Sequence, residues 1–195
     1  MITEFTVTLP KWLESQVAEP RTIPKLEDRM EFVIGLAREN YRHQTGGPFG
    51  AAVFDGAGNL VSVGVNLVED ARCSLLHAEM VAIALAQKNV CRYDLSDGGR
   101  LTYELVASTE PCAMCFGSIH WSGVSRLVCG ARDADARAIG FDEGPKLAEW
   151  QAALVERGIT VVRDVLRREA AAVLQDYLAS GGAIYNACRG PSDCT

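Results

Sequence analysis

The chain has 195 residues, of which 48% are hydrophobic, so it suits one domain that buries a core without disulfide staples. Its formal net charge of −6 disfavours a nucleic-acid partner, because phosphates attract a basic surface. The cysteines number seven, an odd count, and we find neither a signal peptide nor a run of the roughly 20 apolar residues that span a bilayer; we therefore expect a cytoplasmic protein with reduced thiols.

The first half of the chain predicts a helix, a hairpin and a second helix. Over residues 28–43, apolar side chains recur at the spacing of one helix face, at Met30, Val33, Ile34, Ala37 and Tyr41. Two glycines end this helix. The segment FGAAVFDGAGNLVSVGV then predicts two strands, 49–54 and 60–65, joined by a glycine-rich turn. The Ala- and Leu-rich segment LLHAEMVAIALAQK predicts a helix over about 76–88.

The second half of the chain alternates strands and helices. Its predicted elements are a strand at 101–108, a short helix from Cys112 towards Trp121, a strand at 126–131, a helix from Pro145 to about 157, a strand at 159–162 and a helix at 166–179. A hairpin followed by this alternation predicts an α/β fold, a three-layer α/β/α sandwich around a mixed five-stranded sheet. We expect one domain over 1–195, with an N-terminal extension at about 1–25 and a C-terminal tail at about 180–195.

Cys112 and Cys115 are compatible with a redox pair, two buried thiols or half of a metal site. A thioredoxin-like pair usually follows an early strand and encloses a short polar dipeptide, whereas this pair encloses Ala-Met and lies beyond the middle of the chain. His77, in the segment HAE, adds a nitrogen donor. One histidine and two thiolates leave the fourth tetrahedral position of Zn²⁺ open, which is typical of a catalytic zinc site.

Glu79 follows the predicted ligand His77 by two residues, so its carboxylate can face a water molecule at the open position. The spacing H-x-E followed by P-C-x-x-C is the signature of zinc deaminases. All of its fixed residues are present, at His77, Glu79, Pro111, Cys112 and Cys115. The motif therefore favours a metal site over two structural thiols.

Four segments, GGPFGAAVF, HAEMVAIALA, STEPCAMCFGSIHWSGV and AIGFDEGP, together resemble the cytidine deaminase-like superfamily, and within it the small bacterial guanine deaminases. The resemblance covers about residues 28–145. It implies one Zn²⁺ per subunit, bound by His77, Cys112 and Cys115, and a homodimer, often with an exchanged C-terminal segment. It also implies hydrolysis of guanine to xanthine and ammonia, in which zinc-bound hydroxide attacks the amino-bearing carbon and Glu79 shuttles protons.

The resemblance also indicates residues that select the base. It assigns to Glu143, in the segment IGFDEG, a role in moving protons to the leaving amine, with Asp142 beside it. Related guanine deaminases often carry aspartate at the position of Glu143, one methylene shorter. Asn66 occupies a position where the family's asparagine hydrogen-bonds the substrate ring. Two adjacent acids in a glycine-rich turn, or an asparagine in a turn, are otherwise common on protein surfaces.

Three aromatic residues are further candidates for the pocket. Phe49 and Trp121 would flank a planar base by stacking, although either is also compatible with a place in the core. Tyr185, in the segment AIYNA, would close the pocket, across a swapped interface if the tail is exchanged between subunits.

Several alternatives remain open at the level of sequence. Other amino-substituted rings are possible substrates: guanosine, ammeline or another aminotriazine, and cytosine. The tRNA adenosine deaminases share the zinc motif, but they need a basic surface, and the acidic charge and the GFDEG segment argue against that activity. A non-catalytic zinc protein would lack Glu79, and a thiol–disulfide oxidoreductase would form a Cys112–Cys115 disulfide. We expect a small-molecule nucleobase as the partner, and neither nucleic acid nor a membrane.

Overall fold

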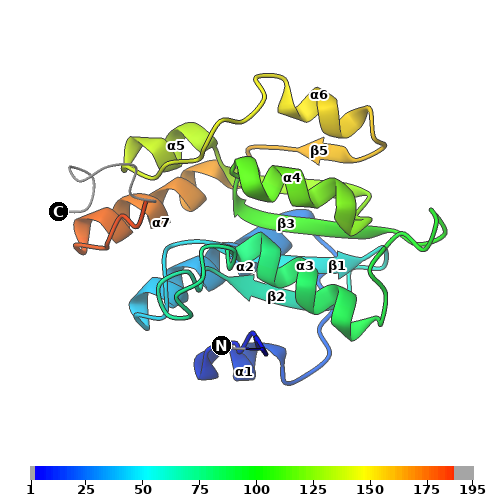
Figure 1. Cartoon of the computed structure of the whole chain (residues 1–195), viewed down its shortest axis with the longest axis horizontal. Helices are drawn as coiled ribbons and strands as arrows, with labels where there is room; N and C mark the ends of the chain where they lie inside the picture. The colour runs from blue at the N-terminus through cyan, green and yellow to red at the C-terminus, as the bar shows by residue number, and fades with distance from the viewer. Residues whose placement is uncertain (1–2, 187–195) are drawn as a thin grey trace.

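A computed structural model describes residues 3–186 and contains one five-stranded sheet (Figure 1). Across the sheet the strand order is β2-β1-β3-β4-β5. The strands are β1 (Gly50–Asp55), β2 (Leu60–Val65), β3 (Tyr103–Thr109), β4 (Arg126–Ala131) and β5 (Thr160–Val162). Strand β1 pairs antiparallel with β2 and β3, whereas β3, β4 and β5 run parallel. The predicted mixed five-stranded sheet is confirmed.

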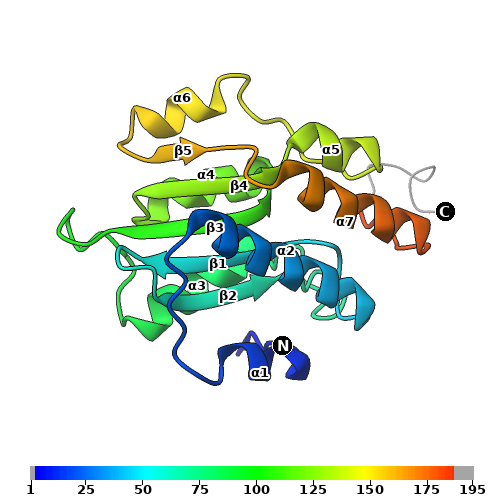
Figure 2. The ribbon, with the colours of Figure 1, turned by 180° about the vertical axis from the view of Figure 1, so that it is seen from behind.

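Helices cover both faces of this sheet. They are α1 (Lys11–Val17), α2 (Leu26–Arg42), α3 (Ala78–Asn89), α4 (Ala113–Ser122), α5 (Asp133–Ala138), α6 (Trp150–Val155) and α7 (Arg167–Ala179). Helices α3, α4 and α6 lie on the face seen in Figure 1, and α2 and α7 lie on the opposite face seen in Figure 2. The arrangement is the three-layer sandwich that the sequence predicts.

Strand β1 shows how the sheet separates two hydrophobic cores. Ala51 and Val53 contribute to the core beneath α3 and α4, whereas Ala52 and Phe54 contribute to the core beneath α2 and α7. Successive side chains of a strand point to opposite faces, so a central strand covered by helices on both sides is apolar at every position. This explains the continuous apolar run that the sequence shows there.

Two helices were not predicted, and a third begins later than predicted. The short helix α5, DADARA, has no apolar periodicity; it begins where Asp135 accepts a hydrogen bond from the backbone N–H of Arg132 (2.8 Å). Helix α1 lies in the predicted N-terminal extension and packs through the fully buried Leu13. Helix α6 begins at Trp150 rather than Pro145, because the residues before it form a turn that contacts the start of α4.

The functional residues gather at one edge of the sheet. Because β1 is antiparallel to its neighbours, its N-terminus lies at the same edge as the C-termini of β2 and β3. Helices α3 and α4 begin after β2 and β3 and therefore also begin at this edge.

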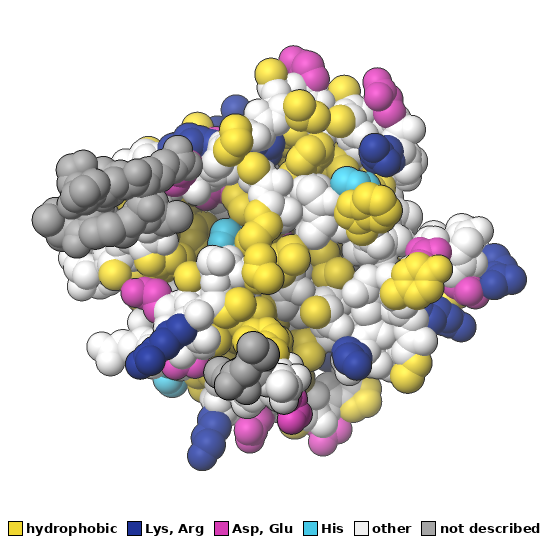
Figure 3. Space-filling model, in the orientation of Figure 1, with side chains coloured by type: hydrophobic (Ala, Val, Ile, Leu, Met, Phe, Trp, Pro, Cys, Tyr) yellow, Lys and Arg dark blue, Asp and Glu magenta, His cyan; other side chains and the backbone are white. Residues whose placement is uncertain are grey.

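Figure 3 shows hydrophobic side chains gathered over the outer side of these two helices. Among the described residues, no helix is long and apolar enough to cross a membrane.

Candidate active site

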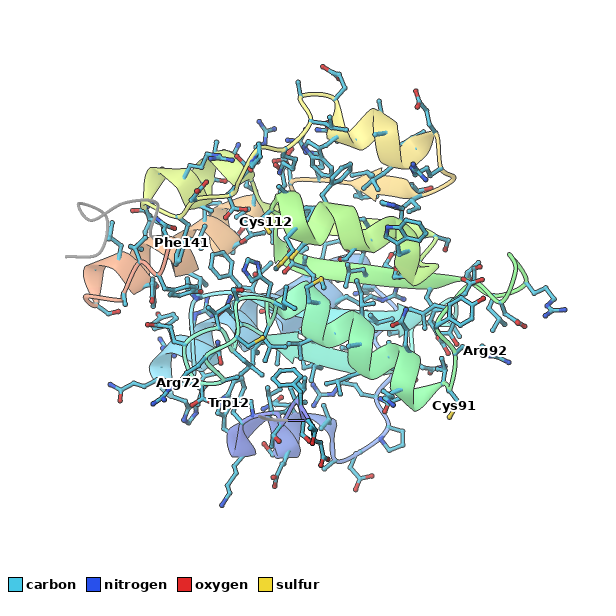
Figure 4. All side chains as sticks on the ribbon, in the orientation of Figure 1. Trp12, Arg72, Cys91, Arg92, Cys112 and Phe141 are labelled. Atoms are coloured by element: carbon cyan, nitrogen blue, oxygen red, sulfur yellow. The ribbon has the colours of Figure 1, made fainter. Side chains whose placement is uncertain are left out.

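Three metal-binding side chains converge where helices α3 and α4 begin. His77 and Cys112 are the N-cap residues of α3 and α4, and Cys115 lies in the first turn of α4. The Nδ1 atom of His77 is 3.5 Å from the Sγ of Cys112 and 3.6 Å from the Sγ of Cys115. Figure 4 shows Cys112 at the start of α4, close to Phe141. The predicted ligands are thus brought together by two segments more than 30 residues apart in the chain.

The separations of these donor atoms fit a tetrahedral zinc ion. With Zn–N at about 2.0–2.1 Å and Zn–S at about 2.3 Å, tetrahedral angles place the nitrogen and a sulfur about 3.5 Å apart. The three donor atoms all lie within 4.8 Å of one another, and within residues 3–186 no further histidine, cysteine or carboxylate joins this group. Three protein ligands with one open position are the arrangement of a catalytic zinc site.

The protonation of the three donors is strongly coupled. A hydrogen bond from Cys115, with help from His77, lowers the pKa of Cys112 to about 4. The same contact with Cys112, together with burial, raises the pKa of Cys115 well above its usual value. Burial lowers the pKa of His77, but the hydrogen bond and charge of Cys112 outweigh burial and make the net shift upward. The donors therefore share protons that a zinc ion displaces on binding.

Glu79 lies in the first turn of α3 and is buried against the zinc ligands. Burial, and secondarily the charge of Cys112, raises the pKa of Glu79 to about 7. A carboxyl group with a pKa near neutrality both accepts and returns a proton readily. Its position on the cavity wall with His77 and Cys112 suits a proton shuttle.

A cavity of about 330 Å³ lies beside the metal ligands and contains most of the predicted substrate residues. Its walls include Phe49, Asn66, Asp142, Glu143 and Tyr185. Asn66 is held from behind by the buried Asn40, whose Nδ2 donates to the backbone carbonyl of Asn66 (2.8 Å). The structure therefore brings these residues, from four separate segments of the chain, together around one space.

Trp121 does not line this cavity. It lies at the C-terminal end of α4, and its side chain is 77% exposed. Because α4 runs away from the zinc ligands at its N-terminus, its last turn faces outward from the sheet edge that carries the site. The structure therefore does not support the expected contact between Trp121 and the base.

Glu143 is buried in the cavity wall beside the start of α4. Burial, followed by the negative charges of Cys112 and Glu79, raises the pKa of Glu143 to about 8. Its backbone carbonyl accepts a hydrogen bond from the N–H of Ala113 (2.9 Å). Neighbouring Asp142 is half-exposed and accepts a hydrogen bond from the N–H of Gly144 (2.9 Å), which shapes the turn.

Phe141 and Asn186 are among the cavity residues that were not predicted from the sequence. Phe141 packs edge-on against Phe49 and Tyr185, with ring centroids 5.0 and 5.2 Å apart. Asn186 accepts a hydrogen bond from the N–H of Asp142 (2.8 Å) and donates one to the carbonyl of Gly140 (2.9 Å). Both residues stand in segments already noted, GFDEG and AIYNA, but only their contacts across the cavity reveal them.

The C-terminal segment closes the cavity within its own chain. The hydroxyl of Tyr185 is buried and has no hydrogen-bond partner among the described residues, as expected for a polar group that meets a ligand. The predicted tail at 180–195 extends past residue 186, so the predicted exchange between subunits falls largely outside the described residues.

The model of the family described as the cytidine and deoxycytidylate deaminase zinc-binding region matches residues 24–131. The chain belongs to this family of zinc-binding deaminases. This match includes the ligands and Glu79, and it confirms the resemblance to the cytidine deaminase-like superfamily.

Two individual relatives show which kinds of deaminase this chain resembles in sequence. Guanine deaminase of Bacillus subtilis (strain 168) is 36% identical over 118 residues, which are 60% of this chain and 71% of the relative. The tRNA-specific adenosine deaminase of Haemophilus influenzae is 39% identical over 93 residues, 48% of this chain and about half (51%) of that protein.

Two solved structures are similar to this protein over nearly the whole chain. The guanine deaminase from Nitrosomonas europaea is 46% identical, covers 92% of this chain and 98% of its own, and superposes with a TM-score of 0.88. The protein NE0047 in complex with 2,6-diaminopurine is 48% identical, with 93% and 96% of the two chains covered and a TM-score of 0.87.

Proposed function

We propose that the protein catalyses the hydrolysis of guanine to xanthine and ammonia. One observation carries this proposal: a three-donor zinc site and two buried carboxyls, Glu79 and Glu143, face the same cavity. The match to guanine deaminases, including one aligned over 98% of its own length, supports guanine as the base.

His77, Cys112 and Cys115 would hold the zinc ion. When bound, zinc lowers the pKa of a water molecule to about 7 and so supplies a nucleophile at neutral pH. Glu79, buried on the cavity wall beside the ligands, accepts a proton from the attacking water and delivers it to the ring nitrogen beside the amino-bearing carbon. The second proton of the attacking water passes to the departing amino group, so oxygen replaces nitrogen at this carbon, ammonia leaves and both carboxyls return to their starting protonation states.

Glu143 suits the second proton transfer. In the zinc-free protein burial raises the pKa of Glu143 to about 8, and its carboxyl lies on the cavity wall, so it is placed to relay a proton to the departing amine. We propose that Asn66 hydrogen-bonds the ring and that Phe49 and Tyr185 contact its faces or edge, with Asp142 at the rim. Structures of NE0047 include the variants N66A and E143D, each in complex with 8-azaguanine, and these numbers coincide with Asn66 and Glu143 here.

The test is a panel of substrates. Zinc-loaded protein is mixed with guanine, guanosine, cytosine, adenine and ammeline, and ammonia release is followed together with the ultraviolet band of each base. We expect guanine to be the preferred substrate. No turnover of guanine would contradict the proposal, and turnover of ammeline or cytosine alone would transfer the same chemistry to another ring.

We further infer that the chain acts as a single domain. We also infer that two copies form a homodimer and that the protein works in the cytoplasm. Helix α4 is rich in apolar side chains, and Trp121 at its end is exposed, which supports an outer side that another chain covers. Figure 3 shows this uncovered apolar area over α3 and α4. The described cysteines, Cys73, Cys91, Cys112, Cys115 and Cys129, form no disulfide, which is compatible with a reducing compartment.

A further inference from the structure

Lys146 is a buried cation that no step of the proposed reaction uses. Its side chain is only 7% exposed, and its Nζ lies 3.0 Å from Oδ1 of Asp133. Nζ also donates a hydrogen bond to the carbonyl of Pro111 (2.8 Å) and lies 4.9 Å from the ring centroid of Trp150. Burying an ammonium group is costly unless it is paired and hydrogen-bonded. The fold thus surrounds this lysine with partners at a place next to the active site.

The hydrogen bond from Lys146 joins two turns. One is the Glu143 turn, defined as residues 139–146, and the other is the Cys112 turn, defined as residues 109–113. Besides the bond from Lys146 to Pro111, the N–H of Ala113 donates to the carbonyl of Glu143 (2.9 Å). These two bonds attach the Glu143 turn to the residues immediately before and after Cys112.

Asp133 at the start of α5 completes the connection. Its carboxylate pairs with Lys146 and also with Nε of Arg137 (2.6 Å). Arg137 in turn donates to the carbonyl of Gly144 (2.8 Å). The Glu143 turn is therefore bound on both of its sides, and Asp133 links the two cations involved.

We propose that Lys146 is a positioning residue that holds the Glu143 turn against the Cys112 turn, so that the Glu143 carboxyl faces the reacting end of the base. The catalytic part of this inference rests on the proposed function. Rates depend steeply on such placement, because a misplacement of about 1 Å can cost on the order of 100-fold. The partners of Lys146 are the carbonyl of Pro111 and the carboxylate of Asp133, so it acts on Glu143 through the position of the turn.

The first test measures the attachment without any substrate. In zinc-loaded Lys146→Met, hydrogen exchange at the Ala113 amide is compared with exchange at core amides of β1. We expect exchange at Ala113 to be about tenfold faster than in the wild type, with exchange at β1 unchanged. The Ala113 amide exchanges when the turn opens locally, whereas the core amides of β1 exchange only when the whole protein unfolds. The control is Arg168→Met, which removes a cation whose side chain is 93% exposed. An unchanged Ala113 amide, or equal acceleration at every amide, overturns the proposal.

The second test measures the effect on the reaction. For guanine, we expect Lys146→Met to lower kcat about 10- to 100-fold while KM changes less than about threefold and zinc content stays the same. In a Glu143→Asp background the same substitution should lower kcat less than about threefold, because the carboxyl is already displaced. Equal losses in both backgrounds, or zinc loss in proportion to activity, would show that Lys146 does not act through Glu143.

The two tests keep the two proposals apart. If the wild-type protein does not hydrolyse guanine, the proposed function fails, whereas the exchange at Ala113 still decides whether Lys146 holds the turn. If guanine is hydrolysed and exchange at Ala113 is unchanged, the proposed function stands and the role of Lys146 is rejected.

Discussion

Glu79 and Glu143 have raised pKa values because the fold buries both carboxyls beside the thiolate of Cys112. Each is an ordinary acidic residue in the sequence, in a helix and in a turn. In the zinc-free protein burial raises the pKa of Glu79 to about 7 and that of Glu143 to about 8, so both carboxyls can exchange protons near neutral pH. Replacing either carboxyl should therefore change activity or the pH dependence of stability.

Replacing Glu79 by alanine should leave zinc binding intact and abolish turnover. The three ligands remain, so we expect one zinc per chain by metal analysis. Loss of the proton shuttle should lower kcat for guanine by several orders of magnitude, as removal of a general acid–base group costs roughly 100- to 10,000-fold. Glu79→Gln serves as the isosteric control. Substantial activity in either variant would rule out Glu79 as the shuttle.

The raised pKa of Glu143 predicts a pH-dependent stability of the zinc-free protein. The folded form, with a pKa of about 8 against 4.5 for an ordinary glutamate, binds more protons between these values than the unfolded form. Stability from this group is therefore complete below about pH 4.5 and is lost as pH rises towards 8. Melting temperatures from pH 5 to 8, measured with a chelator, should fall less in Glu143→Gln than in the wild type. Equal slopes would contradict the buried, neutral carboxyl.

At the scale of elements, the contact between β2 and α3 sets the position of His77 and Glu79. Gly64 of β2 lies against the start of α3, and a Cβ atom there would lie 2.1 Å from the carbonyl oxygen of Ala78. Only a residue without a side chain allows the strand and helix to approach so closely. The geometry of the zinc site thus depends on a glycine that takes no part in the chemistry.

Replacing Gly64 by alanine should therefore destabilise the protein and disturb the site. We expect a loss of about 1–3 kcal/mol in the free energy of unfolding, typical of overpacking, with weaker zinc retention. Gly35, inside α2, is the matched control, because an added Cβ meets no atom within 4 Å. Gly35→Ala should gain about 0.5–1 kcal/mol by favouring the helix. Urea unfolding of both variants checks this, and equal stability of the two would refute the tight contact.

At the scale of the whole molecule, one face remains apolar and exposed over α3 and α4 (Figure 3). Trp121 projects from this face, which explains why a large aromatic residue lies outside the cavity. An exposed tryptophan beside other apolar side chains is typical of a surface that another chain covers.

The proposed homodimer predicts a solution mass of about twice 21.1 kDa by light scattering. Trp121→Glu should shift the protein to the monomer, because a charge would be buried in the apolar interface. Leu178→Glu is the control, since Leu178 is an exposed apolar residue on α7, on the opposite face of the sheet. A monomeric wild type, or dissociation by Leu178→Glu and not by Trp121→Glu, would contradict the proposed interface.

The amino-acid sequence by itself determined the fold class and the metal ligands. Apolar periodicity is local, so it identified most strands and the long helices, and only short elements such as α1 and α5 escaped it. The zinc motif is also local, since His77 precedes α3 and Cys112 precedes α4, and helix N-termini favour such donors.

Only the tertiary structure decided which of the remaining residues meet. Phe141 and Asn186 enter the cavity, Lys146 joins the two turns, and Trp121 faces away from the site. These relations depend on contacts between segments far apart in the chain, and neither periodicity nor composition carries information about such distances. A motif whose residues lie within one turn can be recognised in the sequence. The shape of the pocket depends on contacts that form only when the chain folds.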